Sequence, residues 1–165
     1  MRVAVYPGSF DPITVGHLDI IGRAAEVFDR VVVAVLANPR KTPLLAAAER
    51  ITIVREALAE TAPGLVARVE VEAFDGLTVE FCRARDVRFM VRGLRAISDF
   101  ETEMLLAHNN RQLAPGIDTV FFMTSLEVSY VSSSLVREIA QFGGDVSALV
   151  PAAAAAALLR AYRTT

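Results

Sequence analysis

Tyr6-Pro7-Gly8-Ser9-Phe10-Asp11-Pro12-Ile13-Thr14-Val15-Gly16-His17 is the stretch around which the rest of the chain is organised. The apolar run 3–5 before it predicts a strand, and an amphipathic pattern that begins near Gly16 predicts a helix. A loop shaped by glycine and proline therefore leads into a helix N-terminus, where unpaired backbone N–H groups favour phosphate. We expect a nucleotide's phosphates to lie over this loop, with His17 touching the phosphorus atom that reacts.

Length and composition favour one globular domain over residues 1–165. Hydrophobic residues make up 53% of the chain, which suggests a sheet covered on both faces and a buried face between subunits. The net charge of −2 argues against a nucleic-acid partner. Cys82 is the single cysteine, which excludes an internal disulfide framework and favours a reducing cytoplasm. We expect no membrane partner, since no apolar run approaches the roughly 20 residues that span a bilayer, and no signal peptide, since Pro7-Gly8 interrupts the first apolar run.

Strand-like runs alternate with helical patterns along the chain. The strands are expected at about 2–6, 31–36, 65–71, 88–91 and 119–123, and the helices at about 16–28, 46–60, 77–85, 99–113, 132–142 and after Pro151. Five βα units predict an α/β fold: a single-domain, doubly wound (Rossmann-like), five-stranded parallel sheet in the order 3-2-1-4-5, with helices on both faces. Ligands bind at the switch point of such a sheet, here between strands one and four. The loops expected there are 7–16 and 92–95.

Neither common phosphate-binding loop is present, because the chain lacks G-x-G-x-x-G and G-x-x-x-x-G-K-[ST]. Thr14-Val15-Gly16-His17 stands in their place, and we expect Gly16 to give the backbone room. The alternative is a capping threonine followed by an exposed histidine. Arg92-Gly93-Leu94-Arg95 follows strand four, and each arginine can hold a phosphate with its planar fork; the alternative is a turn with solvated arginines.

The serines at 132–134 precede a helix and either face a triphosphate or serve only as helix caps. Lys41 lies in the loop after strand two, beside the same crevice, although a loop lysine is normally just solvated. Asp99 and Glu103 are spaced as a solvated helix face, and Asp11 is interpreted as a turn residue. We expect an electropositive crevice, and we find no cluster with metal-ligand spacing.

Assembled in this order, the segments resemble the phosphopantetheine adenylyltransferases, bacterial nucleotidyltransferases of coenzyme A synthesis. The resemblance covers nearly the whole chain. It is carried by T-x-G-H at 14–17, R-G-L-R at 92–95, D-F-E-x-E at 99–103 and S-S-S-L at 132–135. It implies that ATP and 4′-phosphopantetheine give dephospho-coenzyme A and pyrophosphate with Mg²⁺, in a homohexamer that coenzyme A inhibits.

The resemblance also implies roles for individual residues. His17 would stabilise the transition state. ATP would contact Ser9, Phe10, His17, Gly93, Leu94, Arg95, Glu103, Val128, Ser129, Tyr130, Val131, Ser132, Ser133 and Ser134. The pantetheine substrate would contact Ser9, Lys41, Thr78 and Arg92. Thr78 stands where a larger apolar residue is usual, and Thr102 replaces an aromatic residue that often lies between the two acids.

Two other functions fit the residues taken alone. One is a related nucleotidyltransferase that acts on nicotinamide mononucleotide or on a phospho-alcohol. The other is a nucleotide sensor without catalysis, which would bind ATP, release no pyrophosphate and need no His17.

Overall fold

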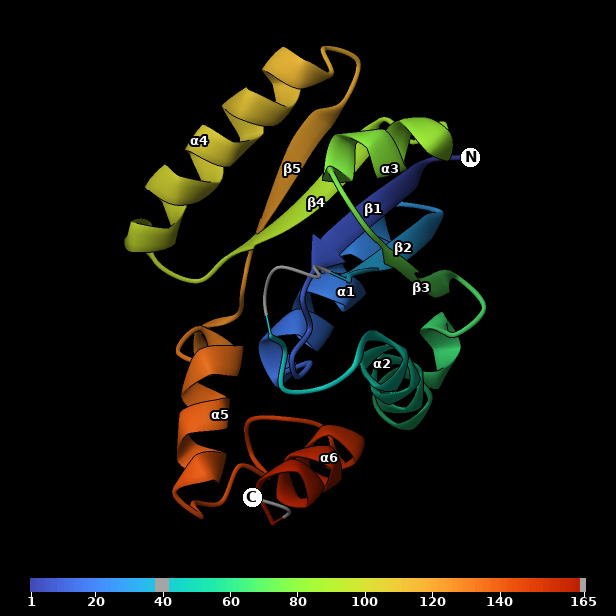
Figure 1. The fold of residues 1–165 in the computed structure, drawn as a ribbon. Coiled ribbons are helices and arrows are strands. Elements are labelled where there is room, and N and C mark those ends of the chain that lie inside the picture. The colour runs from blue at the N-terminus through green and yellow to red at the C-terminus, as the bar shows by residue number, and fades with distance from the viewer. Residues whose placement is uncertain (38–41, 164–165) are drawn as a thin grey trace.

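Five parallel strands form one sheet in the order β3-β2-β1-β4-β5, which confirms the predicted topology (Figure 1). The computed structural model describes residues 1–37 and 42–163. The strands are β1 (Val3–Gly8), β2 (Arg30–Leu36), β3 (Val69–Phe74), β4 (Phe89–Leu94) and β5 (Asp118–Met123). The helices are α1 (Val15–Val27), α2 (Ala47–Thr61), α3 (Thr78–Ala84), α4 (Ile97–Leu113), α5 (Ser133–Gln141) and α6 (Ala152–Arg163), with the short 3₁₀ turns η1 (Pro63–Leu65) and η2 (Leu126–Val128).

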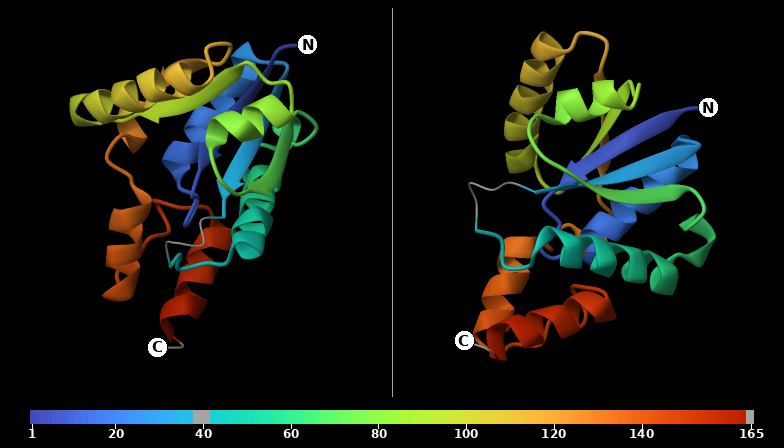
Figure 2. Two further views of the ribbon diagram at one scale, coloured as in Figure 1. Left: turned by 45° about the horizontal axis from the view of Figure 1, so that its top comes forward. Right: turned by 45° about the vertical axis from the view of Figure 1, so that its right-hand side comes forward.

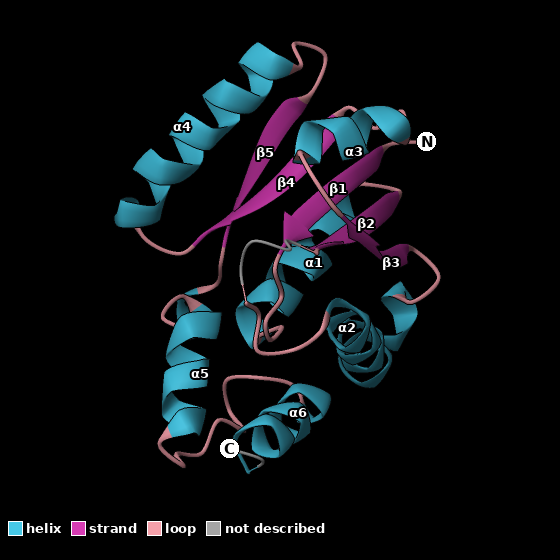
Figure 3. Cartoon of the chain, viewed as in Figure 1, coloured by secondary structure: helices cyan, strands magenta, loops and turns pink. Residues whose placement is uncertain are grey.

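Helices cover both faces of the sheet, and alternate residues of β1, β2, β3 and β4 supply the two cores (Figure 3). Ala4 and Tyr6 of β1 belong to the core shared with α1, α2 and α6, whereas Val5 belongs to the smaller core under α3. Burial on both faces accounts for the continuous apolar run of β2.

The pairing of β1 opens the sheet where a ligand would bind. β1 pairs with β2 along its whole length, from Val3 with Arg30 to Gly8 with Val35. Its pairing with β4 ends at Val5, opposite Met90. Beyond that point the carboxyl ends of β1 and β4 diverge, which leaves a crevice at the predicted switch point.

Helices α5 and α6 lie beyond the carboxyl ends of the strands (Figure 2). α6 packs on α2 and α5 packs on α6. The backbone N–H of Val15 donates to the carbonyl of Leu149 at 3.0 Å, which fixes the start of α1 against the segment leading to α6. The start of α5 thus forms one wall of the crevice, and α6 supports α5 from behind.

Several boundaries differ from the sequence prediction by two residues or more. β3 begins at Val69 instead of residue 65, because Pro63–Leu65 forms a 3₁₀ turn. β1 continues to Gly8 and β4 to Leu94, so that Arg92-Gly93-Leu94 ends a strand and is not a loop after it. None of the described helices combines the length and the apolar character that a bilayer span needs.

Candidate active site

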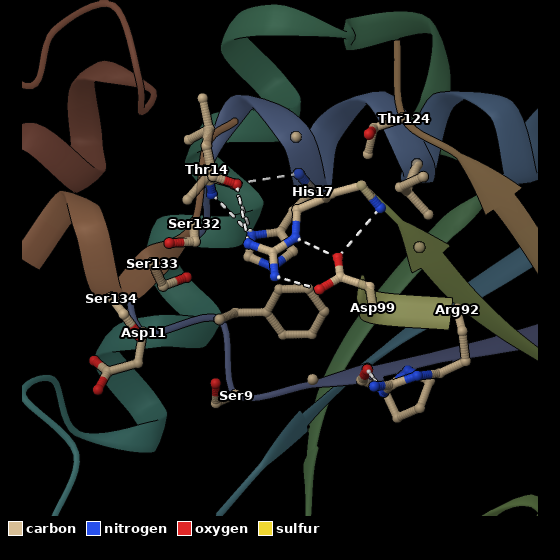
Figure 4. A pocket seen from close by; sticks show the side chains of 18 of the residues that line it. Ser9, Asp11, Thr14, His17, Arg92, Asp99, Thr124, Ser132, Ser133 and Ser134 are labelled. Carbon is tan, nitrogen blue, oxygen red and sulfur yellow. Dashed lines mark hydrogen bonds and ion pairs between the residues drawn. The ribbon is translucent and has the colours of Figure 1, made fainter. Parts of the chain in front are cut away.

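A cavity of about 600 Å³ lies where β1 and β4 diverge, and residues from both strands and from the starts of α1, α4 and α5 line it (Figure 4). Eleven residues predicted to bind substrates line this cavity: Ser9, Phe10, His17, Arg92, Gly93, Arg95, Glu103, Val131, Ser132, Ser133 and Ser134. The imidazole and the two arginines, which are distant in sequence, therefore share one cavity.

The other predicted site residues lie outside the cavity lining, except for Lys41, which the structure does not describe. Leu94 is buried at the end of β4, and 128–130 follow in and after η2, outside the cavity lining. Thr78 is the first residue of α3 and is also absent from the lining. Lys41 lies outside the described residues.

His17 is held by the cap of its own helix. Thr14 is the N-cap of α1, and its hydroxyl accepts from the backbone N–H of His17 at 3.3 Å. The backbone N–H of Thr14 in turn donates to His17 Nδ1 at 3.0 Å. An imidazole nitrogen that accepts this bond carries no proton, so in the neutral ring the proton is on Nε2.

The surroundings of His17 favour that neutral ring. Burial, followed by the charges of Arg95 and Arg92, lowers the pKa of His17 to about 4. At pH 7 the side chain is therefore an uncharged hydrogen-bond donor through Nε2. This form suits a group that stabilises developing negative charge without giving up a proton.

Two aromatic rings support the imidazole. The Phe10 ring meets that of His17 at a centroid distance of 5.0 Å and that of Tyr6 at 5.3 Å. Phe10 has φ 47°, an unusual backbone conformation for a bulky residue. A Cβ on Gly8 would lie 3.0 Å from the Phe10 ring, so glycine there makes room for this packing. At Gly16, by contrast, a Cβ would meet only ordinary protein contacts, nearest 3.6 Å, so the packing of the chain itself does not require a glycine there.

Arg92 is oriented by a two-point ion pair. Its Nε and Nη2 donate to the two carboxylate oxygens of Glu103 at 2.6 and 2.5 Å, and Nη1 donates to the carbonyl of Pro7 at 3.2 Å. Burial lowers the pKa of Arg92, but the hydrogen bond and charge of Glu103 outweigh it and leave the pKa raised. The fork geometry fixes the guanidinium plane inside the cavity.

Arg95 is paired in the same way. Its Nε lies 2.9 Å from Asp99 Oδ2, and Nη1 reaches the carbonyl of Val131 at 3.5 Å. The interpretation of Asp99 and Glu103 as a solvated helix face is therefore wrong. Both acids line the cavity, because α4 packs on β4 and turns this face inward.

The expected electropositive crevice also needs correction for the described residues. Three guanidinium groups line it, on Arg92, Arg95 and Arg137, and three carboxylates balance them, on Asp11, Asp99 and Glu103. A bound polyphosphate must then draw on the partial charge of helix N-termini, or bring a cation with it. In the described part of the chain no three His, Cys, Asp or Glu side chains are grouped to hold a metal ion.

The three serines at the start of α5 differ in their contacts. Ser132 is the N-cap, and its hydroxyl accepts from the backbone N–H of Leu135 at 3.2 Å. Ser133 donates to the carbonyl of Pro12 at 2.8 Å. Ser134 also lines the cavity. Capping and cavity lining therefore coexist at the first turn of α5.

Sequence reasoning gave no role to Arg50 or Arg137, and it interpreted Asp11 first as a turn residue that could lie close to a phosphate. Arg50 is 2% exposed and hydrogen-bonds three backbone carbonyls. A signal was present, because Arg50 shares the helical spacing of the inward residues Ile53 and Val54. Asp11 is buried and accepts two backbone N–H groups, so its carboxylate is already engaged.

Comparison with known proteins gives one consistent family. A family model described as cytidylyltransferase-like matches residues 5–139. A phosphopantetheine adenylyltransferase from Gloeobacter violaceus is 56% identical over 149 residues, which cover 90% of this chain and 89% of that protein. Proteins of the same name from Carboxydothermus hydrogenoformans (151 residues; 92% and 90% covered) and Heliobacterium modesticaldum (165 residues; 100% and 95% covered) are 51% and 48% identical.

A solved structure shares the fold. A Plasmodium falciparum nicotinic acid mononucleotide adenylyltransferase, complexed with NaAD, superposes with a TM-score of 0.72 at 13% identity, covering 96% of this chain and 95% of that chain. This likeness shows that the two chains share the doubly wound fold. It carries no further argument about substrates.

Proposed function

Because this chain belongs to the phosphopantetheine adenylyltransferase family, within the cytidylyltransferase-like proteins, we propose that it transfers the adenylyl group of ATP to 4′-phosphopantetheine. The products are dephospho-coenzyme A and pyrophosphate. The observation that carries the proposal is the single cavity that holds His17, Arg92 and Arg95 beside the first turn of α5.

The reaction needs alignment and charge stabilisation more than a base. The acceptor is a phosphate oxygen, already ionised at pH 7, which attacks the α-phosphorus of ATP. A new P–O bond forms as the bond to the β-phosphate oxygen breaks, and the electron pair leaves with pyrophosphate. Negative charge gathers on the α-phosphate in the transition state, and the Nε2–H of His17 is the donor we assign to it.

Both substrates would share this cavity. For ATP we propose contacts from Ser9, Phe10, His17, 93–95, Glu103 and 128–134. For 4′-phosphopantetheine we propose Ser9, Lys41, Thr78 and Arg92. The bidentate ion pair with Glu103 supports Arg92, since it presents a fixed guanidinium plane to a phosphate.

Mg²⁺ would reach the cavity bound to the phosphates of ATP. Asp11, Asp99 and Glu103 line the cavity, but each already accepts hydrogen bonds from backbone N–H groups or a guanidinium. Mg²⁺ commonly keeps several waters and binds substrate phosphates with few protein ligands. The donor set therefore fits Mg²⁺ carried by ATP, which also offsets the balanced charge of the cavity.

The assembly would be a homohexamer in the cytoplasm, with coenzyme A as a feedback inhibitor. Several large apolar side chains of α4 are exposed to solvent, and so is Met123 of β5. Those of α4 are Phe100, Met104, Leu105, Leu106 and Leu113. Such a surface favours contact with further copies of the chain. Coenzyme A contains the product of the reaction, so the same cavity would bind it.

A pyrophosphate-release assay tests the proposed function. Purified protein with Mg·ATP is offered 4′-phosphopantetheine, nicotinamide mononucleotide or a phospho-alcohol in parallel. We expect release only with 4′-phosphopantetheine, and His17→Ala gives the matched low-activity control. Release only with another acceptor would assign a different nucleotidyltransferase, and ATP binding without any release would favour a sensor.

A further inference from the structure

A buried arginine joins three segments at the edge of the cavity. Arg50, in the first turn of α2, donates from Nε to the carbonyl of Leu45 at 2.9 Å. Its Nη1 donates to the carbonyl of Leu36 at 3.0 Å and also to that of Ser9. The end of β2, the entry to α2 and the loop after β1 therefore meet on one guanidinium. Full burial of an arginine is rare unless its donors are satisfied in this way.

A buried carboxylate joins two of these segments again. Asp11 is 5% exposed, and its Oδ1 and Oδ2 accept from the backbone N–H groups of Leu45 and Leu44 at 2.9 and 2.8 Å. The loop after β1 and the entry to α2 are thus linked in both directions. Arg50 reaches from α2 to Ser9, and Asp11 reaches back to Leu44 and Leu45.

Helix α5 completes the cluster on the other side. Arg137 donates to the main-chain carbonyl of Asp11, and its Nη1 lies 3.9 Å from Asp11 Oδ2. Ser133 donates to the carbonyl of Pro12. In Figure 4, Asp11 lies below the serines that begin α5. The carbonyls of Ser9, Asp11 and Pro12 are therefore all held from outside the loop.

Phe10 lies in the middle of this loop and connects its position to that of the His17 imidazole. Its left-handed backbone, φ 47°, is a conformation that persists at a bulky residue only where the surroundings hold it. Its ring packs against the imidazole of His17 at 5.0 Å. A loop that relaxed would move the ring, and the ring would no longer support the imidazole.

We propose that Asp11 and Arg50 are positioning residues of this reaction, which lock the loop 9–12 to the entry of α2 and, through Phe10, set the place of the His17 imidazole. The proposal rests on the proposed function for its kinetic consequences only. Neither side chain needs to touch a substrate. Their effect is on the placement of a donor that works within a fraction of an ångström.

The alternative is that these hydrogen bonds only stabilise the fold, and Arg68 provides a control with the same kind of contact. The Arg68 side chain also donates hydrogen bonds to three backbone carbonyls: those of Phe28 at 2.9 Å, of Asp29 at 3.3 Å and of Ala25. These carbonyls lie at the end of α1 and the start of β2, and Arg68 is absent from the cavity lining. Removing Arg68 therefore breaks three hydrogen bonds of the same kind without touching the loop 9–12, although Arg68 is exposed and Arg50 is buried.

The test compares Asp11→Asn, Arg50→Lys, Arg50→Met and Arg68→Met by melting temperature, kcat and KM. Asp11→Asn keeps the shape but turns an NH₂ group towards one of the two N–H donors, so it is the deciding variant. We expect it to lower kcat about 10- to 100-fold, within the range for a misplaced catalytic group. The KM for ATP should change less than about threefold, since His17 acts mainly in the transition state. Arg50→Lys should recover part of the kcat that Arg50→Met loses. Arg68→Met should keep kcat within about twofold of the wild type, whatever melting temperature it loses.

The imidazole itself gives a readout that does not depend on turnover. The ¹⁵N resonances of His17 report the hydrogen bond at Nδ1, and we expect them to shift in Asp11→Asn but not in Arg68→Met. Unchanged resonances and wild-type kcat in Asp11→Asn would overturn the proposal, as would an equal kcat loss in Arg68→Met. A wild-type protein that releases no pyrophosphate with any acceptor would overturn the proposed function instead, and the resonances would still decide this inference.

Discussion

At the scale of single residues, T-x-G-H is a capping box with histidine at its third helical position. In the usual box a Glu or Gln side chain there accepts the N-cap N–H. Here His17 Nδ1 accepts it, from Thr14. The cap that starts the helix therefore also chooses the tautomer, which explains why the threonine and the histidine stand three residues apart.

Replacing His17 by alanine should lower kcat about 10²- to 10³-fold, the range for losing one transition-state donor. Part of any loss of stability in this variant comes from the broken cap. His17→Gln separates the two effects, because glutamine can accept from Thr14 at the same position. We expect it to melt closer to the wild type than His17→Ala and still to turn over slowly. Turnover near the wild-type rate in either variant would refute the role of His17.

The neutral state of His17 should be visible in the pH dependence of stability. Its pKa is about 4 in the folded protein against an ordinary value near 6.5, so the unfolded chain binds more protons between these values. The contribution of this group to folding is therefore complete above pH 6.5 and is lost as the pH falls towards 4.

Urea denaturation at pH 7, 5.5 and 4.5 measures this contribution. The wild type should lose more free energy of unfolding across the series than His17→Gln, which has no titrating group there. Parallel losses in the two proteins would show that the pKa of His17 is not lowered by folding. The second histidine, His108, is exposed on α4 and stays present in both proteins.

Sequence patterns identified the groups that face the cavity better than the groups that hold them. The serines at 132–134 and the two arginines were found from their position after strands. Asp99 and Glu103 were misread because an (i, i+4) acidic pair is normally solvated. The partner of Glu103 is Arg92, which comes from β4 through tertiary packing, whereas the partner of Asp99 is Arg95, four residues before it in the chain. Asp11 shows the same limit, since its partners are backbone N–H groups 33 and 34 residues away.

At the scale of elements, the order of the strands was predictable but their ends were not. Five βα units with short connections leave few topologies, and the observed order is the predicted one. The end of a strand depends on its neighbour: β4 continues to Leu94 because β5 pairs with it as far as Met123. This pairing places Arg92 and Gly93 in a strand, where they line the cavity.

Gly93 sets the distance between β4 and α1, and this contact can be tested by a double-mutant cycle. A Cβ at position 93 would lie 3.0 Å from Cγ1 and 3.3 Å from Cδ1 of Ile20. Gly93→Ala should therefore destabilise the protein by about 1–3 kcal/mol, as overpacking does. In an Ile20→Ala background the added methyl has room, so the same change should cost much less. Equal costs in both backgrounds, measured by urea denaturation, would show that Ile20 is not the obstacle.

At the scale of the whole molecule, the fold leaves one helix only partly covered. α4 packs on β4 and β5 along a narrow face, and Figure 1 shows it at the outer edge of the sheet. Phe100, Leu105 and Leu113 are exposed, although charged residues make up 22% of the chain and are available to cover such a face. The high apolar content of the sequence had suggested a face between subunits, and the structure gives the residues that would form it.

The last prediction concerns that face. Leu105 of α4 is 62% exposed, so a charge there costs little in an isolated subunit but much in a packed interface. Leu105→Glu should therefore lower the mass measured by sedimentation equilibrium below that of the proposed hexamer while leaving the melting temperature of the subunit nearly unchanged.

Val66→Glu is the control for this prediction. Val66 lies just after η1, close to the opposite edge of the sheet, and is 49% exposed, so this variant introduces the same charge away from α4. If both variants kept the wild-type mass, α4 would not be an interface, and if both lost it, the interface would extend well beyond α4. Because α4 also carries Asp99 and Glu103, which orient the two arginines of the cavity, a subunit released from its neighbours should show a raised KM for both substrates.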